Sequence, residues 1–153
     1  ELVGDFDVQA DFDLLNWPTA NGFNVSIETG GVDYLQICRY SYSVSDTDKE
    51  GYLLNNNGTM TSDPTSDMSG KLRLKRTGDT IEAFYWQTNA WHSMGASTDS
   101  QFTANTRVHL YSDSGNPSRY IPGEVVKVAF DNFQVTNQYL GSGSLNFLQL
   151  LLQ

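Results

Sequence analysis

The chain has 153 residues, the size of a single domain, which can bury a hydrophobic core without disulfide bonds or a structural metal. Its 9 basic and 18 acidic side chains give a net charge of −9, which disfavours nucleic acids and anionic membranes as partners. The single cysteine, Cys38, excludes an internal disulfide, and its apolar neighbours predict that it packs as a small hydrophobic side chain. No apolar run is long enough to span a membrane.

Three strands are predicted in the first third of the chain. Apolar and polar side chains alternate without exception from Asp5 to Leu14, which indicates a strand with one buried and one wet face. Trp17-Pro18 ends this strand, and a second alternating segment begins at Phe23. A third strand, at about residues 33–43, is apolar or aromatic on both faces, which predicts a central position covered on both sides.

The middle of the chain contains the clearest hairpin. After a short predicted strand at residues 51–54, the Asn-, Ser- and Asp-rich residues 55–69 are predicted to form a loop. Residues 69–91 then show strand, tight turn and strand, with Gly78-Asp79 in the turn because a two-residue turn needs a positive φ. Residues 91–94 are predicted to form another short strand, and Trp17 and Trp91 are expected at the edges of the core.

The last two strands are predicted at residues 107–112 and 124–135. In the final strand the apolar phase shifts at Asp131-Asn132, which indicates a β-bulge. No helical periodicity occurs before residue 140. About nine strands at this spacing predict an all-β fold, a two-sheet antiparallel β-sandwich, over residues 1–140.

The last residues differ in composition from the rest. Residues 141–144 (GSGS) have the composition of a flexible linker, and an apolar peptide follows at 145–152. Residues 141–153 are therefore expected to be an engineered addition or a native interaction segment that binds a protein partner or promotes self-association.

Four segments together resemble the concanavalin A-like lectin/glucanase superfamily, in its laminin-G-like jelly-roll branch. They are GDFDVQADFDL (4–14), GKLRLKRTGDTIEAFYW (70–86) with Trp91 after it, RVHLYSDSG (107–115) and VKVAFDNFQV (126–135). The resemblance implies a jelly-roll sandwich of bacterial extracellular type. It leaves the activity open, because the superfamily contains lectins, carbohydrate-binding modules, glycoside hydrolases and adhesion modules.

The predicted binding site lies on the strand at 107–113. Its polar and aromatic side chains share one parity, whereas Val108 and Leu110 share the other, so the polar set is expected on the outer sheet surface. Such groups can hydrogen-bond sugar hydroxyls, and aromatic rings can stack on a sugar ring. The alternative is ordinary cross-strand pairing of the same side chains. The candidate ligand-binding residues are Tyr40, Tyr42, Trp86, Arg107, His109, Tyr111 and Asp113.

No catalytic or metal site is predicted with named ligands. The Glu-x-Asp-x-x-Glu pattern of the superfamily's retaining glucanases is absent, and neither a nucleophile elbow nor a zinc spacing occurs. The outward aspartates at 5, 7, 11 and 13 are expected to form a solvated strand face without aromatic neighbours. Ca²⁺ is a candidate cofactor, because the predicted loops contain the oxygen donors Asp63, Asp67, Asp113, Asn116, Asp131 and Asn132.

The sequence therefore favours a non-catalytic, lectin-like carbohydrate-binding module from a secreted or cell-surface protein, with a glycan as its partner. A structural or adhesive interaction domain that uses the apolar tail is the second hypothesis. A glycoside hydrolase is the third, since no pair of catalytic carboxylates is recognisable.

Overall fold

The structure, a computed structural model, describes residues 2–17, 23–30, 34–44, 47–98, 106–113 and 125–137. Within these ranges the chain forms ten strands: β1 (Phe6–Asn16), β2 (Phe23–Gly30), β3 (Leu35–Val44), β4 (Thr47–Asn56), β5 (Thr59–Pro64), β6 (Ser69–Thr77), β7 (Thr80–Gln87), β8 (Ala90–Thr98), β9 (Arg107–Asp113) and β10 (Lys127–Asn137). No helix among the described residues is long and apolar enough to cross a membrane. The C-terminal peptide at 141–153 lies outside the described residues.

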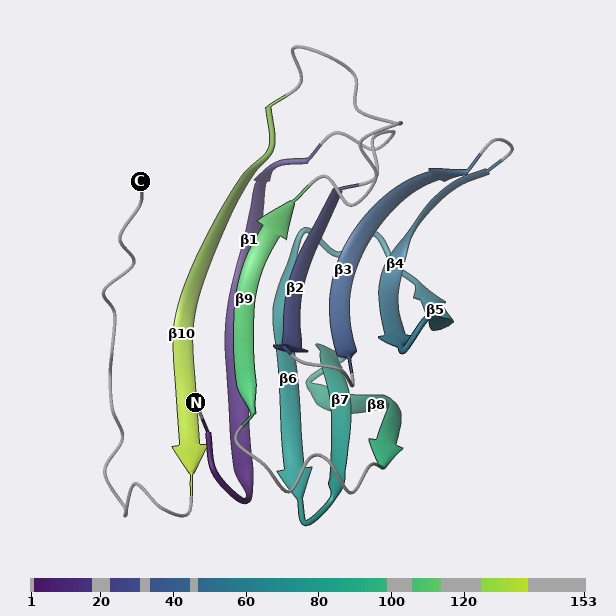
Figure 1. Cartoon of the computed structure of the whole chain (residues 1–153). Helices are drawn as coiled ribbons and strands as arrows, with labels where there is room; N and C mark the ends of the chain where they lie inside the picture. Colours follow the sequence, from purple (N-terminus) through teal and green to yellow (C-terminus); the bar gives the residue numbers. More distant parts are fainter. Residues whose placement is uncertain are drawn as a thin grey trace.

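The strands form two antiparallel sheets that pack face to face (Figure 1). One sheet, called the β6 sheet here after its central strand, has the order β10-β1-β6-β7-β8. The other, called the β3 sheet, has the order β5-β4-β3-β2-β9. The prediction of an all-β, two-sheet antiparallel sandwich is confirmed.

The core lies between the two sheets and follows the alternation of the sequence. In β1 the apolar parity is buried, whereas Asp7, Gln9 and Asp11 are half-buried on the outer face. Every residue of β3 from Leu35 to Ser41 is buried, which confirms its predicted central position. The core residues are Phe6, Val8, Ala10, Phe12, Leu14, Trp17, Val25, Ile27, Leu35, Ile37, Tyr52, Leu54, Leu72, Leu74, Ile81, Ala83 and Tyr85.

The predicted hairpin at 69–91 is confirmed and extends into a third strand. Thr77 pairs with Thr80, and Gly78 between them has a φ of 64°, the conformation for which glycine has no steric cost. A second tight turn at Thr88-Asn89, with φ of 51° and 62°, joins β7 to β8.

The prediction of a loop over residues 55–69 is correct only for the turn at 57–58 and for residues 65–68. Residues 59–64 form β5, which pairs with β4 through the turn at Asn57-Gly58. Both turn residues have positive φ, and Asn-Gly is the preferred sequence for such a hairpin turn. All β5 side chains are exposed, so the strand has no alternation of buried and exposed residues that composition could reveal.

The predicted bulge in the last strand is confirmed. Between the pairs Gln9–Gln134 and Asp11–Asp131, β10 contains one more residue than β1. Asn132 has a φ of 48°, and the extra residue brings its side chain toward β1. The bulge therefore shapes the outer surface of the β6 sheet at this end.

Candidate functional site

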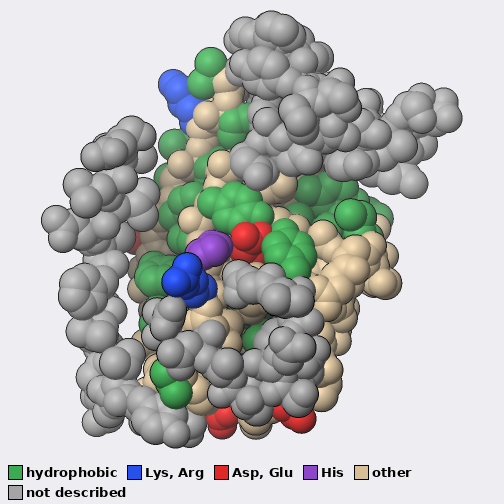
Figure 2. Space-filling view, in the orientation of Figure 1, with side chains coloured by type: hydrophobic (Ala, Val, Ile, Leu, Met, Phe, Trp, Pro, Cys, Tyr) green, Lys and Arg blue, Asp and Glu red, His purple; other side chains and the backbone are tan. Residues whose placement is uncertain are grey.

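The predicted ligand-binding residues of β9 lie on the outer face of the β3 sheet, at its edge. Figure 2 looks onto this sheet and shows a histidine, a basic side chain and an acidic side chain together over β9 and β2. As predicted, Val108 and Leu110 pack against the core, whereas Arg107 and His109 are exposed. Tyr111 is half-buried.

Sequence reasoning did not identify the residue at the centre of this face, Glu28 of β2. The hydroxyl of Tyr111 donates a hydrogen bond to the Glu28 carboxylate, and His109 Nδ1 lies 3.5 Å from the same carboxylate. Burial, followed by hydrogen bonds with Glu28 and Tyr111, raises the pKa of Tyr34 far above its usual value. Glu28 is opposite His109 in the pairing of β2 with β9, and no pattern in the sequence indicates this pairing.

On the same face, several polar side chains are linked to one another by hydrogen bonds. Gln36 Nε2 donates to the Tyr111 hydroxyl and to Ser26 Oγ, each at 2.9 Å, and Ser26 Oγ donates to Asn24 Oδ1 at 2.8 Å. The Tyr111 hydroxyl is therefore hydrogen-bonded to both Glu28 and Gln36. This hydroxyl is part of an internal hydrogen-bond network.

The structure does not bring all the predicted residues together. Tyr40 lies on the same outward parity but is only 7% exposed, beside the buried Cys38. Tyr42 and Asp113 belong to β3 and β9, and their side chains lie outside what the structure describes. Trp86 belongs to β7 of the β6 sheet, on the opposite side of the sandwich, so the expectation that it joins the β9 residues is wrong.

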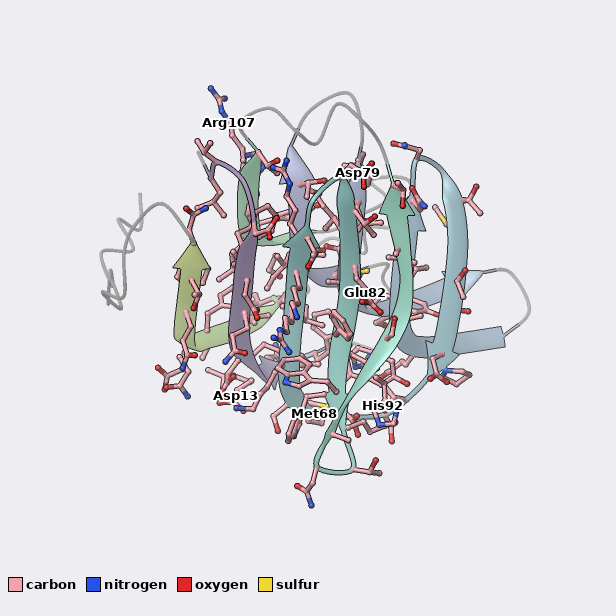
Figure 3. The ribbon with its side chains drawn as sticks, turned by 90° about the horizontal axis from the view of Figure 1, so that it is seen from below. Asp13, Met68, Asp79, Glu82, His92 and Arg107 are labelled. Carbon is pink, nitrogen blue, oxygen red and sulfur yellow. The ribbon has the colours of Figure 1, made fainter. Side chains whose placement is uncertain are left out.

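A cavity of about 450 Å³ lies beside Trp86, at one end of the β6 sheet. Asp13 and Met68 are near this end in Figure 3, and Asp79 is at the opposite end. The cavity lies within the roughly 300–1,000 Å³ that small-molecule sites occupy. It is lined by Asp11, Phe12, Asp13, Asp67, Ser69, Gly70, Lys71, Trp86, Gln87, Thr88, Asn89, Asp131 and Asn132.

The bulge of β10 and the pairing of β1 with β6 form one wall of the cavity. Asp11 Oδ2 accepts hydrogen bonds from Lys71 Nζ at 3.0 Å and from Asn132 Nδ2 at 2.9 Å. The same face continues with an ion pair between Asp7 and Arg73. The expected solvated aspartate face is therefore corrected: these two aspartates are paired with β6 side chains, and Trp86 lines the same cavity as Asp11.

Trp86 is half-buried and is fixed by a second indole. The rings of Trp86 and Trp91 meet edge to face, with centroids 5.2 Å apart and planes at 75°. The Arg73 guanidinium lies 5.2 Å from the Trp91 ring centroid and 5.6 Å from that of Phe84. Trp17 is buried at the core as predicted, but Trp91 belongs to this outer surface.

Asp67 lines the cavity and is held by side chains of both sheets. Its carboxylate accepts hydrogen bonds from the Tyr52 hydroxyl at 3.2 Å and from Gln87 Nε2 at 3.1 Å. Its backbone carbonyl accepts a hydrogen bond from Arg39 Nε at 2.9 Å. The segment between β5 and β6 is thus fixed by side chains from both sheets.

Replacing Gly70 with alanine is expected to destabilise the domain by about 1–3 kcal/mol, because the site is already filled. A Cβ at Gly70 would lie 2.7 Å from the Tyr52 hydroxyl oxygen and 3.0 Å from the Phe12 ring. Urea unfolding followed by tryptophan fluorescence measures the change. Ser69→Ala, at the exposed neighbouring position, is the control, and Tyr52→Phe added to Gly70→Ala should recover part of the loss. Equal stability of Gly70→Ala and the wild type would contradict this packing.

The metal expectation is not supported by the described residues, which contain no group of three His, Cys, Asp or Glu side chains that could hold an ion. Asp63 accepts a hydrogen bond from the Tyr85 hydroxyl, and Asp67 is occupied as described. Asn116 and the side chain of Asp113 lie outside the described residues.

Comparison with known proteins gives the fold and no family. No family model and no curated protein match the chain. Two crystal structures of the GH43 protein BlXynB from Bacillus licheniformis, one of them a point mutant, match 87% of this chain at 17% and 16% identity, with TM-scores of 0.64 and 0.62. This chain spans 27% of the length of those proteins.

A third similar structure is a functionally unknown protein from Saccharomyces cerevisiae. It matches 88% of this chain at 13% identity with a TM-score of 0.61, and 70% of its own length is covered. At these identities the likenesses show a shared β-sandwich fold alone.

Proposed function

We propose that this domain is a non-catalytic, lectin-like carbohydrate-binding module of a secreted or cell-surface protein, on a concanavalin A-like jelly-roll scaffold. The observation that carries the proposal is the cavity beside Trp86. It joins an aromatic wall to amide, hydroxyl and carboxylate side chains within about 450 Å³. Sugars present an apolar C–H face and a rim of hydroxyl groups. The aromatic wall suits the C–H face, and the polar side chains suit the hydroxyl groups.

The polar groups around the cavity fit a neutral or amine-bearing sugar better than an acidic one. Lys71 is the single basic side chain in the lining and is paired with Asp11, whereas Asp13 and Asp131 are exposed carboxylates. Carboxylates accept hydrogen bonds from sugar hydroxyls and repel uronate and sulfate groups. The net charge of −9 acts in the same direction.

The similar solved structures support the proposal only through the fold. Two of them are structures of a GH43 protein, and this chain spans 27% of the length of that protein. A domain of this size attached to a larger carbohydrate-related protein is the arrangement that the proposal predicts.

The test is binding of the full chain to a glycan array, followed by calorimetry with the glycans that score. Trp86→Ala is expected to weaken binding at least tenfold, because the ligand loses its aromatic wall. His109→Ala, an exposed residue on the opposite sheet, is the matched control and should bind as the wild type does.

Two results would overturn the proposal. Unchanged glycan affinity of Trp86→Ala would show that glycans bind elsewhere on the domain. Absence of binding of the folded protein to every glycan would favour the interaction-domain hypothesis. Incubating the bound oligosaccharides with the protein and analysing products checks catalysis. Release of shorter sugars would show an enzyme in place of a binding module.

A further inference from the structure

A row of outward side chains crosses the whole β6 sheet at the level of the cavity. Asp131 of β10 is opposite Asp11 of β1, and Asp11 is opposite Lys71 of β6. Leu72 of β6 pairs with Tyr85 of β7, so Lys71 and Trp86 follow one position beyond this last pair, and Trp86 is opposite Trp91 of β8. All five positions share the outer face of the sheet. The row thus places charged and hydrogen-bonding groups at one end and two indoles at the other.

This row extends beyond the lining of the cavity. Neighbouring strands are about 4.8 Å apart, so the four intervals between β10 and β8 give a row of about 19 Å. One sugar ring covers only part of that distance. The cavity includes the first four positions of the row but not Trp91. Trp91 therefore extends the surface beyond the space that a single sugar beside Trp86 would fill.

Trp91 is held in place by side chains that lie outside the cavity. The Arg73 guanidinium contacts the Trp91 and Phe84 rings and is itself bound by both carboxylate oxygens of Asp7. A half-buried indole fixed in this way is prepared to receive a ligand without the loss of side-chain entropy that a mobile ring would suffer. Arg73 is thus a positioning residue for this part of the surface.

We propose that the ligand is a saccharide chain of at least two units that lies across the strands, with one unit in the cavity beside Trp86 and the next on Trp91. The inference rests on the proposed carbohydrate-binding function and adds the ligand class. Because the two indole planes differ by 75°, both can stack on the chain only if its successive rings are rotated relative to each other. A flexible, soluble single chain therefore fits better than the flat surface of a crystalline polysaccharide.

The test is a length series measured by calorimetry on the full chain, with cello-, xylo- and manno-oligosaccharides of one to six units as probes. The wild type is expected to bind a tetrasaccharide at least tenfold more tightly than the monosaccharide of the same series. Trp91→Ala should lose this gain and weaken the monosaccharide by a smaller factor, because the Trp91 ring also supports the ring of Trp86. Trp86→Ala should weaken both, and Lys75→Ala, an exposed residue on β6 outside the row, should change neither.

The outcomes separate the two proposals. Equal affinity for one and for four sugar units would overturn the saccharide-chain inference and leave the carbohydrate-binding function in place. No binding to any probe or array glycan would overturn both proposals. Retention of the length gain in Trp91→Ala would also overturn the inference. Thermal unfolding shows whether Trp91→Ala is folded, and Trp91→Phe, which keeps an aromatic ring, should retain part of the gain.

Discussion

Replacing Glu50 with alanine should cost about 3–5 kcal/mol of folding free energy, the largest single-residue effect we expect. Arg39 belongs to the core-facing parity of β3, and its side chain is fully buried. Its guanidinium pairs with the Glu50 carboxylate and donates to the carbonyls of Tyr40 and Asp67. Removing one partner of a buried ion pair leaves an uncompensated charge in the protein interior. Urea unfolding at neutral pH measures the loss.

The matched control replaces both charges together. Arg39→Met with Glu50→Leu removes the pair and fills its volume with apolar atoms, an exchange that is often neutral or stabilising. The double variant should therefore be more stable than Glu50→Ala alone. A Glu50→Ala protein within about 0.5 kcal/mol of the wild type would show that the pair does not hold the fold.

The Arg39 contact also links the core to the candidate site. Because Arg39 Nε donates to the Asp67 carbonyl, the double variant loses a support of a segment that lines the cavity. We expect that variant to be stable and yet to bind glycans more weakly than the wild type. Glycan affinity would then fall without a loss of folding stability. If the ion pair had a purely structural role, the two would change together.

The local pattern of the chain predicted the strands well, because alternation reports which side of a strand is buried. The strand at 5–14, the turn at Gly78-Asp79 and the bulge at Asp131-Asn132 were all predicted correctly. Strand β5 was missed because every one of its side chains is exposed. A strand without a buried face has no period of two to detect.

The site was harder to predict, because alternation assigns a residue to a face of a strand but does not tell to which sheet the strand belongs. Trp86 was grouped with Tyr111 on parity, and the two lie on opposite sides of the sandwich. Asp11 and Trp86 are 75 positions apart and come together only through the pairing of β1, β6 and β7. Long-range register of this kind cannot be derived from one sequence.

Three tyrosines are expected to make the domain lose stability steeply above pH 10. Burial is the main cause in each case and raises the pKa of Tyr34, Tyr52 and Tyr85, the last to about 12. Hydrogen bonds to Glu28, Asp67 and Asp63 respectively act in the same direction, because each phenol donates to a carboxylate.

The sign follows from the two states of the chain. Below pH 10 these phenols are protonated in both the folded and the unfolded chain, so their contribution is fully present. Between pH 10 and the raised folded values only the unfolded chain ionises, which lowers the free energy of unfolding. Each such tyrosine contributes a slope of about 1.4 kcal/mol per pH unit.

Urea unfolding at half-unit steps from pH 8 to 12 measures the combined slope of the unfolding free energy. Tyr85→Phe should make this slope shallower by the contribution of one tyrosine. A slope equal in the wild type and in Tyr85→Phe would show that this phenol ionises with its ordinary pKa in the folded protein, and the bond to Asp63 would then not tie β5 to the β6 sheet.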